Sequence, residues 1–484
     1  MPADRSDRRP SRSPRSELSV LVERFGGSLR AGGEGVTVSG VTLDSRRVEP
    51  GDLYAALPGS TVHGARFAGQ AAAAGAAAVL TDQAGADLGG DQAGAGLPLW
   101  VVERPRAVLG QVAAEIYGRA AQRLRTIGVT GTHGKTTTCF MLEAGLSGAG
   151  ETPAVIGTVG TRIAGSFVKT ALTTPEAPDL HALFAVMEER GVGACAMEVS
   201  SHALVMGRVD GVLFDLAVFT NLGRDHLDFH AGIEDYFAAK AGLFTPERAA
   251  RGLVNLDDPY GRRLTVQAGV PVRTFSPGGA VEADWRAEQV VAGPAGSNLV
   301  VVAPDGRRYP MSVAVAGRFN VANALAAVAA LGEVGVEVAA ACAGVSGLAG
   351  IPGRMESIPN PLGLTVIVDY AHKPDAVEAV LAGLRPMTQG RLITVIGAGG
   401  DRDRGKRELM GEVAARLGDV LVVTDDNPRS EDPGRIRAAV IAGALQVPAT
   451  ERAEVVELGD RRAAIETGLA RAVAGDCVLV AGKG

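Results

Sequence analysis

Short apolar runs and longer Ala-rich stretches alternate along most of the chain, separated by turns that contain glycine or proline. In the N-terminal part, apolar and β-branched runs predict strands over residues 36–43, 52–56 and 99–102, and an Ala-rich stretch predicts a helix over residues 68–78. Because strands and helix alternate over short distances, this part favours a small α/β unit.

A second unit begins near Leu124, where a β-branched run, a glycine-rich turn and a helical stretch follow one another. Apolar runs of strand length lie at residues 193–199, 213–219 and 252–255. Turn residues predict a β-rich insertion over residues 281–315, and helices are expected over residues 233–244 and 319–334. The α/β alternation of the first unit therefore continues.

A third unit follows residues 350–356 and shows the most regular alternation of the chain. Four apolar runs predict strands, at residues 364–368, 391–396, 419–424 and 477–481. Helical periodicity lies between them, at residues 375–384, 406–417, 433–446 and 460–474. This order is typical of a doubly wound, Rossmann-like sheet.

Composition and charge narrow the class of protein. The chain has 484 residues and a formal net charge of −6, which argues against nonspecific binding of nucleic acid or of an anionic membrane. No apolar run reaches the roughly 18 residues of a membrane span, and the first 16 residues lack the apolar core of a signal peptide. The four cysteines form no CxxC pair, so reduced thiols in the cytoplasm are expected.

The sequence GTHGKT at residues 131–136 follows a predicted strand and opens a predicted helix, which is the setting of a phosphate-binding loop. The glycines let backbone N–H groups face phosphate oxygens, Lys135 neutralises their charge, and the Thr136 hydroxyl is placed to bind Mg²⁺. The longer GxxxxGK[ST] form would require glycine at Val129, so the match is to a shorter variant. The alternative is a structural turn with an incidental lysine.

Polar clusters follow the next two predicted strands. Glu198 ends the first of them, where it could complete a Mg²⁺ shell with Thr136, and two Asp and two His stand within residues 225–230 after the second. Each cluster alone could be a solvated loop, and a zinc site is the weaker alternative because no cysteine supports it. Together they favour an ATP–Mg²⁺ site. By its spacing alone, Lys240 is expected to be a surface lysine.

A second glycine-rich loop, GAGGDR at residues 397–402, ends a strand of the third unit. The third glycine of a dinucleotide fingerprint would fall on Arg402, so a nicotinamide or flavin site is not expected there. The loop carries a charged cluster instead, at the sheet edge where α/β proteins commonly bind ligands.

Eleven ordered motifs in the chain resemble the Mur ligase family of bacterial cell-wall synthesis, in particular its diaminopimelate-adding branch. The resemblance runs from about residue 41 to residue 484. It rests on LDSRRVEPGDLYAALPG, TGTHGKTTT, LTTPEAPDL, MEVSSHAL, TNLGRDHLDFH, AAKAGLF, GRFNVANALAA, GIPGRME, VDYAHKPDA, GAGGDRDRGKRELMG and TDDNPRSEDP.

The resemblance implies an α/β fold of three domains: a small α/β N-terminal domain that binds a UDP-sugar, a P-loop mononucleotide-binding central domain, and a Rossmann-like C-terminal domain that binds an amino acid. With the predicted elements, the boundaries are a disordered tail at residues 1–17 and domains at residues 18–122, 123–349 and 350–484.

The implied activity is an ATP-dependent amide ligation that adds diaminopimelate to the D-Glu γ-carboxylate of UDP-MurNAc-L-Ala-D-Glu through an acyl phosphate, with two Mg²⁺ ions, in a cytoplasmic monomer. The residues implied to bind ATP are Gly131, Thr132, His133, Gly134, Lys135, Thr136, Thr137, Asn320, Asn323, Arg354 and Asp369, with His372 as a further candidate. The metal ligands implied are Thr136, Glu198, His226 and Lys240, the last carrying CO₂ as N6-carboxylysine, and Lys135, Glu198, His226, Lys240 and Arg354 are the implied catalytic set.

Two further sets are implied for the other substrates. The UDP-sugar is assigned to Ser45, Ser60, Thr61, Thr173, Thr174, Ser200 and Arg208. Diaminopimelate is assigned to Arg402, Asp426, Asn427, Arg429 and Gly482.

The chain departs from the family pattern in two places. Met206 stands where many relatives have Gln, and the family continues from GKG into His-Glu whereas this chain ends at Gly484. We therefore expect the sequence to be cut short at its substrate pocket.

Two alternatives stay open on the sequence. One is another amide ligase of the same superfamily, similar to MurF or to folylpolyglutamate synthetase, which the DNPR motif disfavours. The other is a nucleotide-binding regulatory or scaffolding protein without chemistry, which has no need for all of Glu198, His226, Lys240, Arg354 and Asp369.

Overall fold

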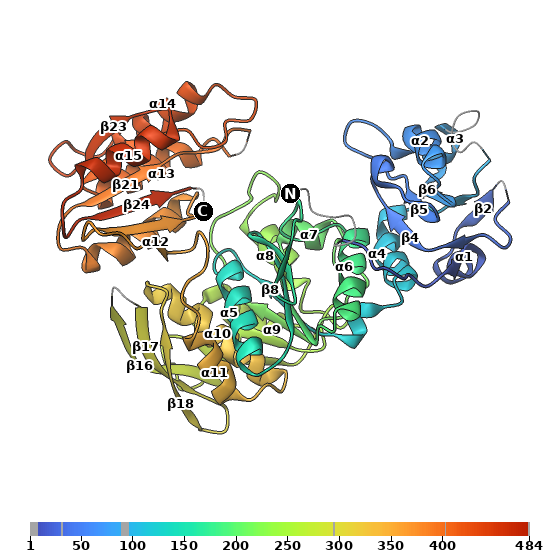
Figure 1. Ribbon diagram of the computed structural model, residues 1–484, viewed down its shortest axis with the longest axis horizontal. Helices are drawn as coiled ribbons and strands as arrows, with labels where there is room; N and C mark the ends of the chain where they lie inside the picture. Colours follow the sequence, from blue (N-terminus) through green and yellow to red (C-terminus); the bar gives the residue numbers. More distant parts are fainter. Residues whose placement is uncertain (1–7, 31, 89–95, 294–295, 402, 483–484) are drawn as a thin grey trace.

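The computed structural model describes residues 8–30, 32–88, 96–293, 296–401 and 403–482. Three α/β domains follow one another along the chain, with the central domain between the other two (Figure 1). Each domain is built around its own sheet, as the alternating sequence pattern predicts.

The N-terminal domain has a five-stranded sheet of order β2-β7-β6-β5-β4, in which only the β2–β7 pair is antiparallel. A two-stranded ribbon of β1 and β3 lies beside it. The strands are β1 (Ser16–Glu17), β2 (Ser28–Arg30), β3 (Thr37–Val38), β4 (Gly40–Thr42), β5 (Asp52–Ala55), β6 (Ala78–Thr81) and β7 (Leu99–Val101), and the helices are α1 (Leu18–Phe25), α2 (Ala68–Ala73), α3 (Gln83–Leu88) and α4 (Pro105–Ile116). Short 3₁₀ turns are η2 (Ser45–Arg47), η3 (Gly64–Phe67) and η4 (Ala120–Arg123).

Residues 8–17 are not a disordered tail, although their composition predicts one. The Arg9 guanidinium donates to both carboxylate oxygens of buried Asp52 in β5, at 2.7 and 2.9 Å. The backbone N–H groups of Ser11 and Arg12 donate to Glu189 of the central domain, at 2.9 and 3.0 Å. Composition could not reveal this because each partner lies far away along the chain. The first seven residues lie outside the described part.

The central domain contains an eleven-stranded sheet of order β11-β10-β9-β12-β8-β13-β14-β15-β16-β17-β18. The inner part of this sheet, in the order β9-β12-β8-β13-β14-β15-β16, is parallel. Antiparallel strands extend it at both ends, β10 and β11 beyond β9, and β17 and β18 beyond β16. The strands are β8 (Arg125–Thr130), β9 (Pro153–Gly157), β10 (Gly160–Ile163), β11 (Ser166–Val168), β12 (Ala194–Glu198), β13 (Leu216–Phe219), β14 (Gly252–Asn255), β15 (Val272–Ser276), β16 (Trp285–Gly293), β17 (Gly296–Val302) and β18 (Arg308–Val313). Its helices are α5 (Lys135–Gly148), α6 (Ala177–Glu189), α7 (Ser201–Val205), α8 (Ile233–Ala241), α9 (Pro259–Gln267), α10 (Arg318–Glu333) and α11 (Val338–Ser346).

Helices α5, α10 and α11 pack together on one face of this sheet, and α6 lies on the other face (Figure 1). Where α5 and α11 cross, Gly148 and Gly344 leave no room for a side chain, because a Cβ placed on Gly148 would lie 2.5 Å from the Gly344 Cα. A Cβ on Gly344 would meet the Ala144 carbonyl oxygen at 2.3 Å. Small residues thus allow the helix that begins at the phosphate loop to pack closely against its neighbour.

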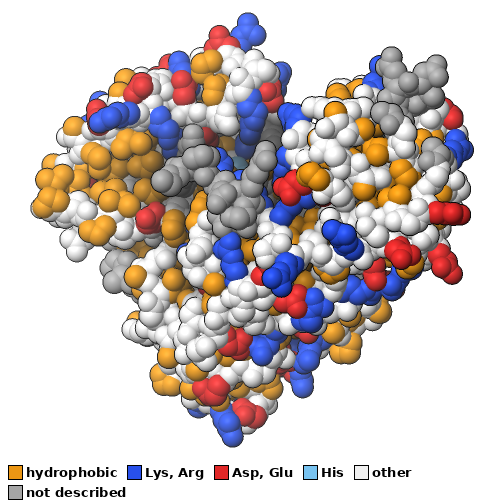
Figure 2. Space-filling model, turned by 45° about the vertical axis from the view of Figure 1, so that its right-hand side comes forward, with side chains coloured by type: hydrophobic (Ala, Val, Ile, Leu, Met, Phe, Trp, Pro, Cys, Tyr) orange, Lys and Arg blue, Asp and Glu red, His pale blue; other side chains and the backbone are white. Residues whose placement is uncertain are grey.

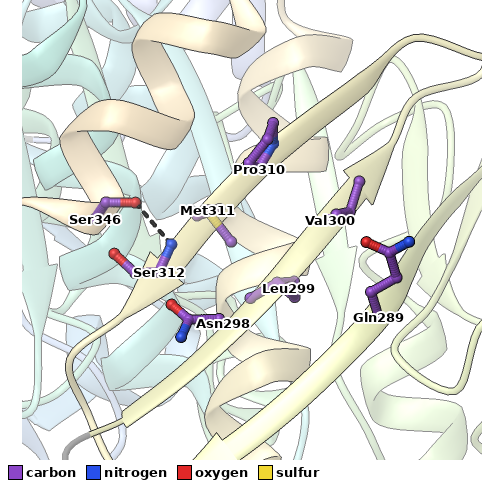
Figure 3. Close-up of a pocket in the computed structure, with 8 residues that line it drawn as sticks. All are labelled: Gln289, Asn298, Leu299, Val300, Pro310, Met311, Ser312 and Ser346. Atoms are coloured by element: carbon purple, nitrogen blue, oxygen red, sulfur yellow. Dashed lines mark hydrogen bonds between the residues drawn. The ribbon is translucent and has the colours of Figure 1, made fainter.

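Strand β18 forms one edge of this sheet. The Ser312 N–H donates to the Ser346 hydroxyl of α11 at 3.1 Å (Figure 3). Pro310, two residues earlier and therefore facing the same way, has no N–H to offer. Both features reduce the number of free N–H groups along β18 and so disfavour pairing with another chain.

The C-terminal domain has a six-stranded sheet of order β19-β20-β24-β21-β22-β23, parallel except for the β19–β20 pair. The helices lie on both faces, since α15 packs with one apolar cluster and α12, α13 and α14 with another. The strands are β19 (Glu356–Ser357), β20 (Thr365–Asp369), β21 (Leu392–Ile396), β22 (Val420–Val423), β23 (Glu454–Glu457) and β24 (Cys477–Ala481), and the helical elements are α12 (Pro374–Leu384), η5 (Arg385–Met387), α13 (Lys406–Leu417), α14 (Pro433–Ala444) and α15 (Arg461–Arg471).

All four cysteines are buried free thiols. In the described parts of the chain, no helix combines the length and apolar character needed to cross a membrane.

Candidate active site

A cavity of about 970 Å³ lies between the central and C-terminal domains. Its central-domain wall is formed where β8, β12 and β13 end, so three adjacent parallel strands deliver their following loops to one place. The surface is hollowed between the two outer lobes of the molecule, and Lys and Arg side chains gather along this hollow (Figure 2).

The loop after β8 has the backbone of a phosphate-binding turn. Gly131 and Gly134 adopt φ angles of 145° and 85°, which side chains with a Cβ disfavour, and α5 begins directly afterwards at Lys135. The turn is fixed from the β13 side, because the His133 N–H donates to the Asn221 side chain at 2.9 Å and the Thr220 hydroxyl donates to the His133 carbonyl at 2.7 Å. The helix N-terminus therefore points into the cavity as an anion site.

Two lysines converge on this loop. The ammonium groups of Lys135 and Lys240 each donate to the Gly131 carbonyl at 2.8 Å. Burial lowers the pKa of Lys135 to about 8. Lys240 is 1% exposed, and burial together with the charge of Lys135 lowers its pKa well below the usual value. The expectation of a surface lysine from spacing alone is wrong, because α8 docks this side chain against the phosphate loop.

Thr136 and Glu198 meet beside the loop. The Thr136 hydroxyl donates to Glu198 Oε1 at 2.8 Å, and the Thr158 N–H donates to the same oxygen at 2.7 Å. From the C-terminal side, Arg354 Nη2 donates to the Thr136 hydroxyl at 3.1 Å. A hydroxyl, a buried carboxylate and a guanidinium are thus assembled next to the place where phosphates would lie.

The donor atoms suit magnesium bound with a nucleotide. Thr136 and Glu198 offer hard oxygen ligands, and His226 adds an imidazole that also lines the cavity. Within the described ranges, no three His, Cys, Asp or Glu side chains are close enough to form a metal cage by themselves. Mg²⁺ commonly takes one or two protein ligands and completes its shell with water and phosphate, so this set fits it.

His226 is held in an unusual position. Its backbone φ is 53°, and its Nε2 lies 2.9 Å from Asp225 Oδ2. Its ring meets the His202 ring edge-on, with centroids 4.6 Å apart, and the His202 ring stacks on Phe229. A carboxylate partner on one ring nitrogen orients the other nitrogen for a ligand.

The remaining predicted nucleotide residues also reach this cavity. Asn320 and Asn323 are buried at the start of α10 and are hydrogen-bonded to each other at 2.9 Å, and a Cβ on Gly134 would lie 2.2 Å from Asn323 Oδ1. Asp369 accepts from the N–H groups of Met355 and Ala371, each at 2.8 Å, and burial raises its pKa. The cavity lining includes Thr132, His133, Gly134, Lys135, Thr136, Thr137, Asn320, Asn323, Arg354, Asp369 and His372.

The residues predicted to hold the UDP-sugar fall into two groups. Thr173 and Ser200 line the cavity, and Thr174 lies directly behind them, donating to the Glu198 carbonyl at 2.8 Å. Arg208 does not line it and pairs with Glu176 at 2.8 Å. Ser45, Ser60 and Thr61 lie in the N-terminal domain, where Ser45 is buried and the other two are exposed, and the structure does not bring them to the cavity.

The predicted amino-acid residues lie on the opposite wall. Asp426, Asn427, Arg429 and Gly482 line the cavity where β22 and β24 end. Arg429 has a φ of 51° and donates to the Gly400 carbonyl, so the two loops of the C-terminal domain contact each other. Arg402 lies outside the described residues.

Several residues of the cavity were not singled out from the sequence. Thr158 follows β9, the strand next to β12, so the rule that polar side chains after parallel strands converge could have found it. Asn221 and Asp225 stand inside the motif that supplied His226. Lys373 and Asp375 contact the central domain only because two domains pack together. No pattern in the neighbouring sequence indicates these contacts.

Comparison with known proteins agrees with this geometry. Models of the Mur ligase family catalytic domain, the Mur ligase middle domain and the Mur ligase glutamate ligase domain match residues 37–117, 129–331 and 353–484. A protein of Streptomyces coelicolor named UDP-N-acetylmuramoyl-L-alanyl-D-glutamate--2,6-diaminopimelate ligase is 54% identical over 98% of this chain and 93% of its own. The chain belongs to the Mur ligase family.

Further relatives of this Mur ligase carry the same name. One from Corynebacterium glutamicum is 48% identical over 97% of this chain and 92% of its own. A solved structure titled with that ligase name is 33% identical, covers 96% of this chain and 93% of its own, and has a TM-score of 0.69. The structure of MurF from Acinetobacter baumannii shares the fold, at 20% identity, 97% and 96% coverage and a TM-score of 0.69. The family resemblance drawn from the motifs and the three-domain α/β fold are confirmed.

Proposed function

We propose that this protein uses ATP to join diaminopimelate to the D-Glu γ-carboxylate of UDP-MurNAc-L-Ala-D-Glu, a step of peptidoglycan precursor synthesis. The observation that carries the proposal is that the phosphate loop and Asp426, Asn427 and Arg429 line the same cavity. Relatives that match almost the whole chain and are named for this ligation support it.

The first step is transfer of the ATP γ-phosphoryl group to the acceptor carboxylate, which gives an acyl phosphate and ADP. Lys135 and the N-terminus of α5 bind the transferring phosphates, and the Arg354 guanidinium beside Thr136 stabilises charge that develops there. Two Mg²⁺ ions, held by Thr136, Glu198, His226 and carboxylated Lys240, would neutralise phosphate charge when bound.

In the second step, the neutral amine of the incoming amino acid attacks the acyl carbon, the carbon–oxygen bond to phosphate breaks, and inorganic phosphate leaves while the nitrogen loses one proton to solvent. The loops after β22 and β24 position the amino acid opposite the phosphate loop. Holding both reactants in one closed cavity replaces a slow encounter by an oriented reaction and limits hydrolysis of the acyl phosphate.

The deciding experiment measures phosphate release from ATP with UDP-MurNAc-L-Ala-D-Glu and a panel of amino acids. Release that depends on diaminopimelate, with the tripeptide product seen by mass spectrometry, is the expected result. Release with L-lysine or D-Ala-D-Ala but not with diaminopimelate would overturn the proposal in favour of another amide ligase. Absence of release with every amine tested would overturn it in favour of a nucleotide-binding protein without chemistry.

Arg429 is expected to select the amino acid. A planar guanidinium can pair with the distal carboxylate that diaminopimelate has and lysine lacks. Arg429→Met should raise the KM for diaminopimelate about 10- to 100-fold and leave the KM for ATP unchanged. Exposed Arg435 on α14 of the same domain provides the matched control, Arg435→Met. An equal rise in both KM values would contradict the assignment.

A further inference from the structure

The segment before and at the start of α12 connects the C-terminal domain to the phosphate-loop side of the cavity. The Lys373 ammonium forms an ion pair with Asp225, which follows β13 of the central domain. Two residues later, Asp375 Oδ2 lies 2.9 Å from Nε2 of His133, within the phosphate loop itself. One ion pair and one histidine–carboxylate contact therefore join these domains directly beside the nucleotide position.

The Lys373–Asp225 pair is the more protected of the two. The side chains of Lys373 and Asp225 are 15% and 12% exposed, compared with 36% and 40% for His133 and Asp375. Exposed pairs contribute little, because solvent screens them, whereas removing one partner of a shielded pair leaves a charge without compensation. The Lys373–Asp225 pair should therefore contribute more to holding the two domains together than the His133–Asp375 contact.

Asp225 connects Lys373 to the candidate metal ligand His226. The same oxygen, Oδ2, faces both Lys373 Nζ and His226 Nε2. Lys373 fixes the carboxylate from the C-terminal domain, and the carboxylate in turn fixes the imidazole ring. The orientation of His226 consequently depends on the docking of a different domain.

We propose that Lys373 is a positioning residue, which latches the C-terminal domain onto the central domain through Asp225 and so orients His226 only when the cavity is closed. This inference rests on the proposed ligase function. Lys373 acts through Asp225, so it is distinct from the residues assigned to the reacting groups.

The charge of Lys373 also acts on the two lysines at the phosphate loop. Burial lowers the pKa values of Lys135 and Lys240, and the positive charge of Lys373 lowers both further, for Lys240 after that of Lys135. Asp225 opposes this repulsion for both lysines. A bound polyphosphate would add further negative charge, so closure and nucleotide binding should favour each other.

The test combines kinetics with an interdomain distance. Lys373→Met should lower kcat about 10- to 100-fold, the usual range for loss of a group that orients a ligand residue, while Lys373→Arg retains most of the activity. Spin labels on Val266→Cys in α9 and Val473→Cys after α15 report the distance, since both positions are exposed and the native cysteines are buried. With ATP present, the distance distribution should be broader in Lys373→Met than in the wild type.

Two comparisons make the result decisive. Arg416→Met removes an exposed ion pair within the C-terminal domain and should change neither measurement. If the pair acts as a unit, Lys373→Met combined with Asp225→Asn should be no slower than the slower single variant.

Wild-type kcat in Lys373→Met, an unchanged distance distribution, or multiplying effects in the double variant would each overturn the latch. If the wild-type protein shows no amino-acid-dependent turnover, the proposed function fails, whereas the distance measurement still tests the latch.

Discussion

Lys240→Ala is expected to reduce turnover below about one-thousandth of the wild-type rate, because it removes a proposed ligand from the phosphate site. In the structure the unmodified ammonium lies beside Lys135, where two positive charges share one carbonyl acceptor. The lowered pKa of Lys240 supplies the neutral amine that adds CO₂. The resulting carbamate reverses the charge, so the side chain can bind a cation rather than repel it.

Intact-protein mass spectrometry in bicarbonate buffer should show one added CO₂ on the wild type and none on Lys240→Ala. Short carboxylates such as acetate should restore part of the activity of the alanine variant by occupying the vacated volume. Lys169→Ala, at an exposed lysine of the same domain, serves as control. Full activity in CO₂-free buffer, or no rescue by any carboxylate, would remove the carbamate from the mechanism.

Glu198→Gln is expected to lower kcat by about 100- to 1000-fold, since stabilisation of phosphoryl charge by a metal is worth several kcal/mol. The amide keeps the size of the side chain and can still accept from the Thr158 N–H, which donates to Glu198 at 2.7 Å. It lacks the negative charge that would face a cation beside the Thr136 hydroxyl. The loss should therefore be electrostatic rather than structural.

Magnesium titration separates these two causes. The Gln variant should need a higher Mg²⁺ concentration for half-maximal rate, while its thermal midpoint stays near that of the wild type. Glu247→Gln, at an exposed residue after α8, should match the wild type in both measurements. An unchanged Mg²⁺ requirement in Glu198→Gln would argue against its role as a ligand.

Much of the fold could be predicted because, in most elements, the local pattern of apolar residues matches the secondary structure that forms. The strand at residues 252–255 and the helix at residues 406–417 have the predicted bounds. The Ala-rich helix expected to reach residue 78 ends at Ala73, because Gly75 adopts a φ of 97° and residues 78–81 pair as β6. Strand β23 was missed, since its sequence EVVE is half charged and its strand state comes from pairing with β22.

The proximity of two candidate residues could be predicted where their polar side chains stand at or just after the end of a strand. Thr136 and Glu198 come from such positions and meet as expected. The burial of Lys240 could not be predicted from its helix alone. The side chain is buried because α8 packs against the phosphate loop after β8, where Lys240 donates to the Gly131 carbonyl. Lys373 and Asp225 are separated by more than a hundred residues, and nothing local in either sequence segment identifies its partner.

The glycine contact between α5 and α11 has an evolutionary consequence. Neither Gly148 nor Gly344 touches the cavity, yet a methyl group on either would push away the helix on which Lys135 and Thr136 stand. A substitution at this helix crossing should therefore affect catalysis although neither residue lines the cavity. Sequence drift at these two positions should be as restricted as at the phosphate loop, and an engineer who stabilises helices by replacing glycine with alanine should leave both unchanged.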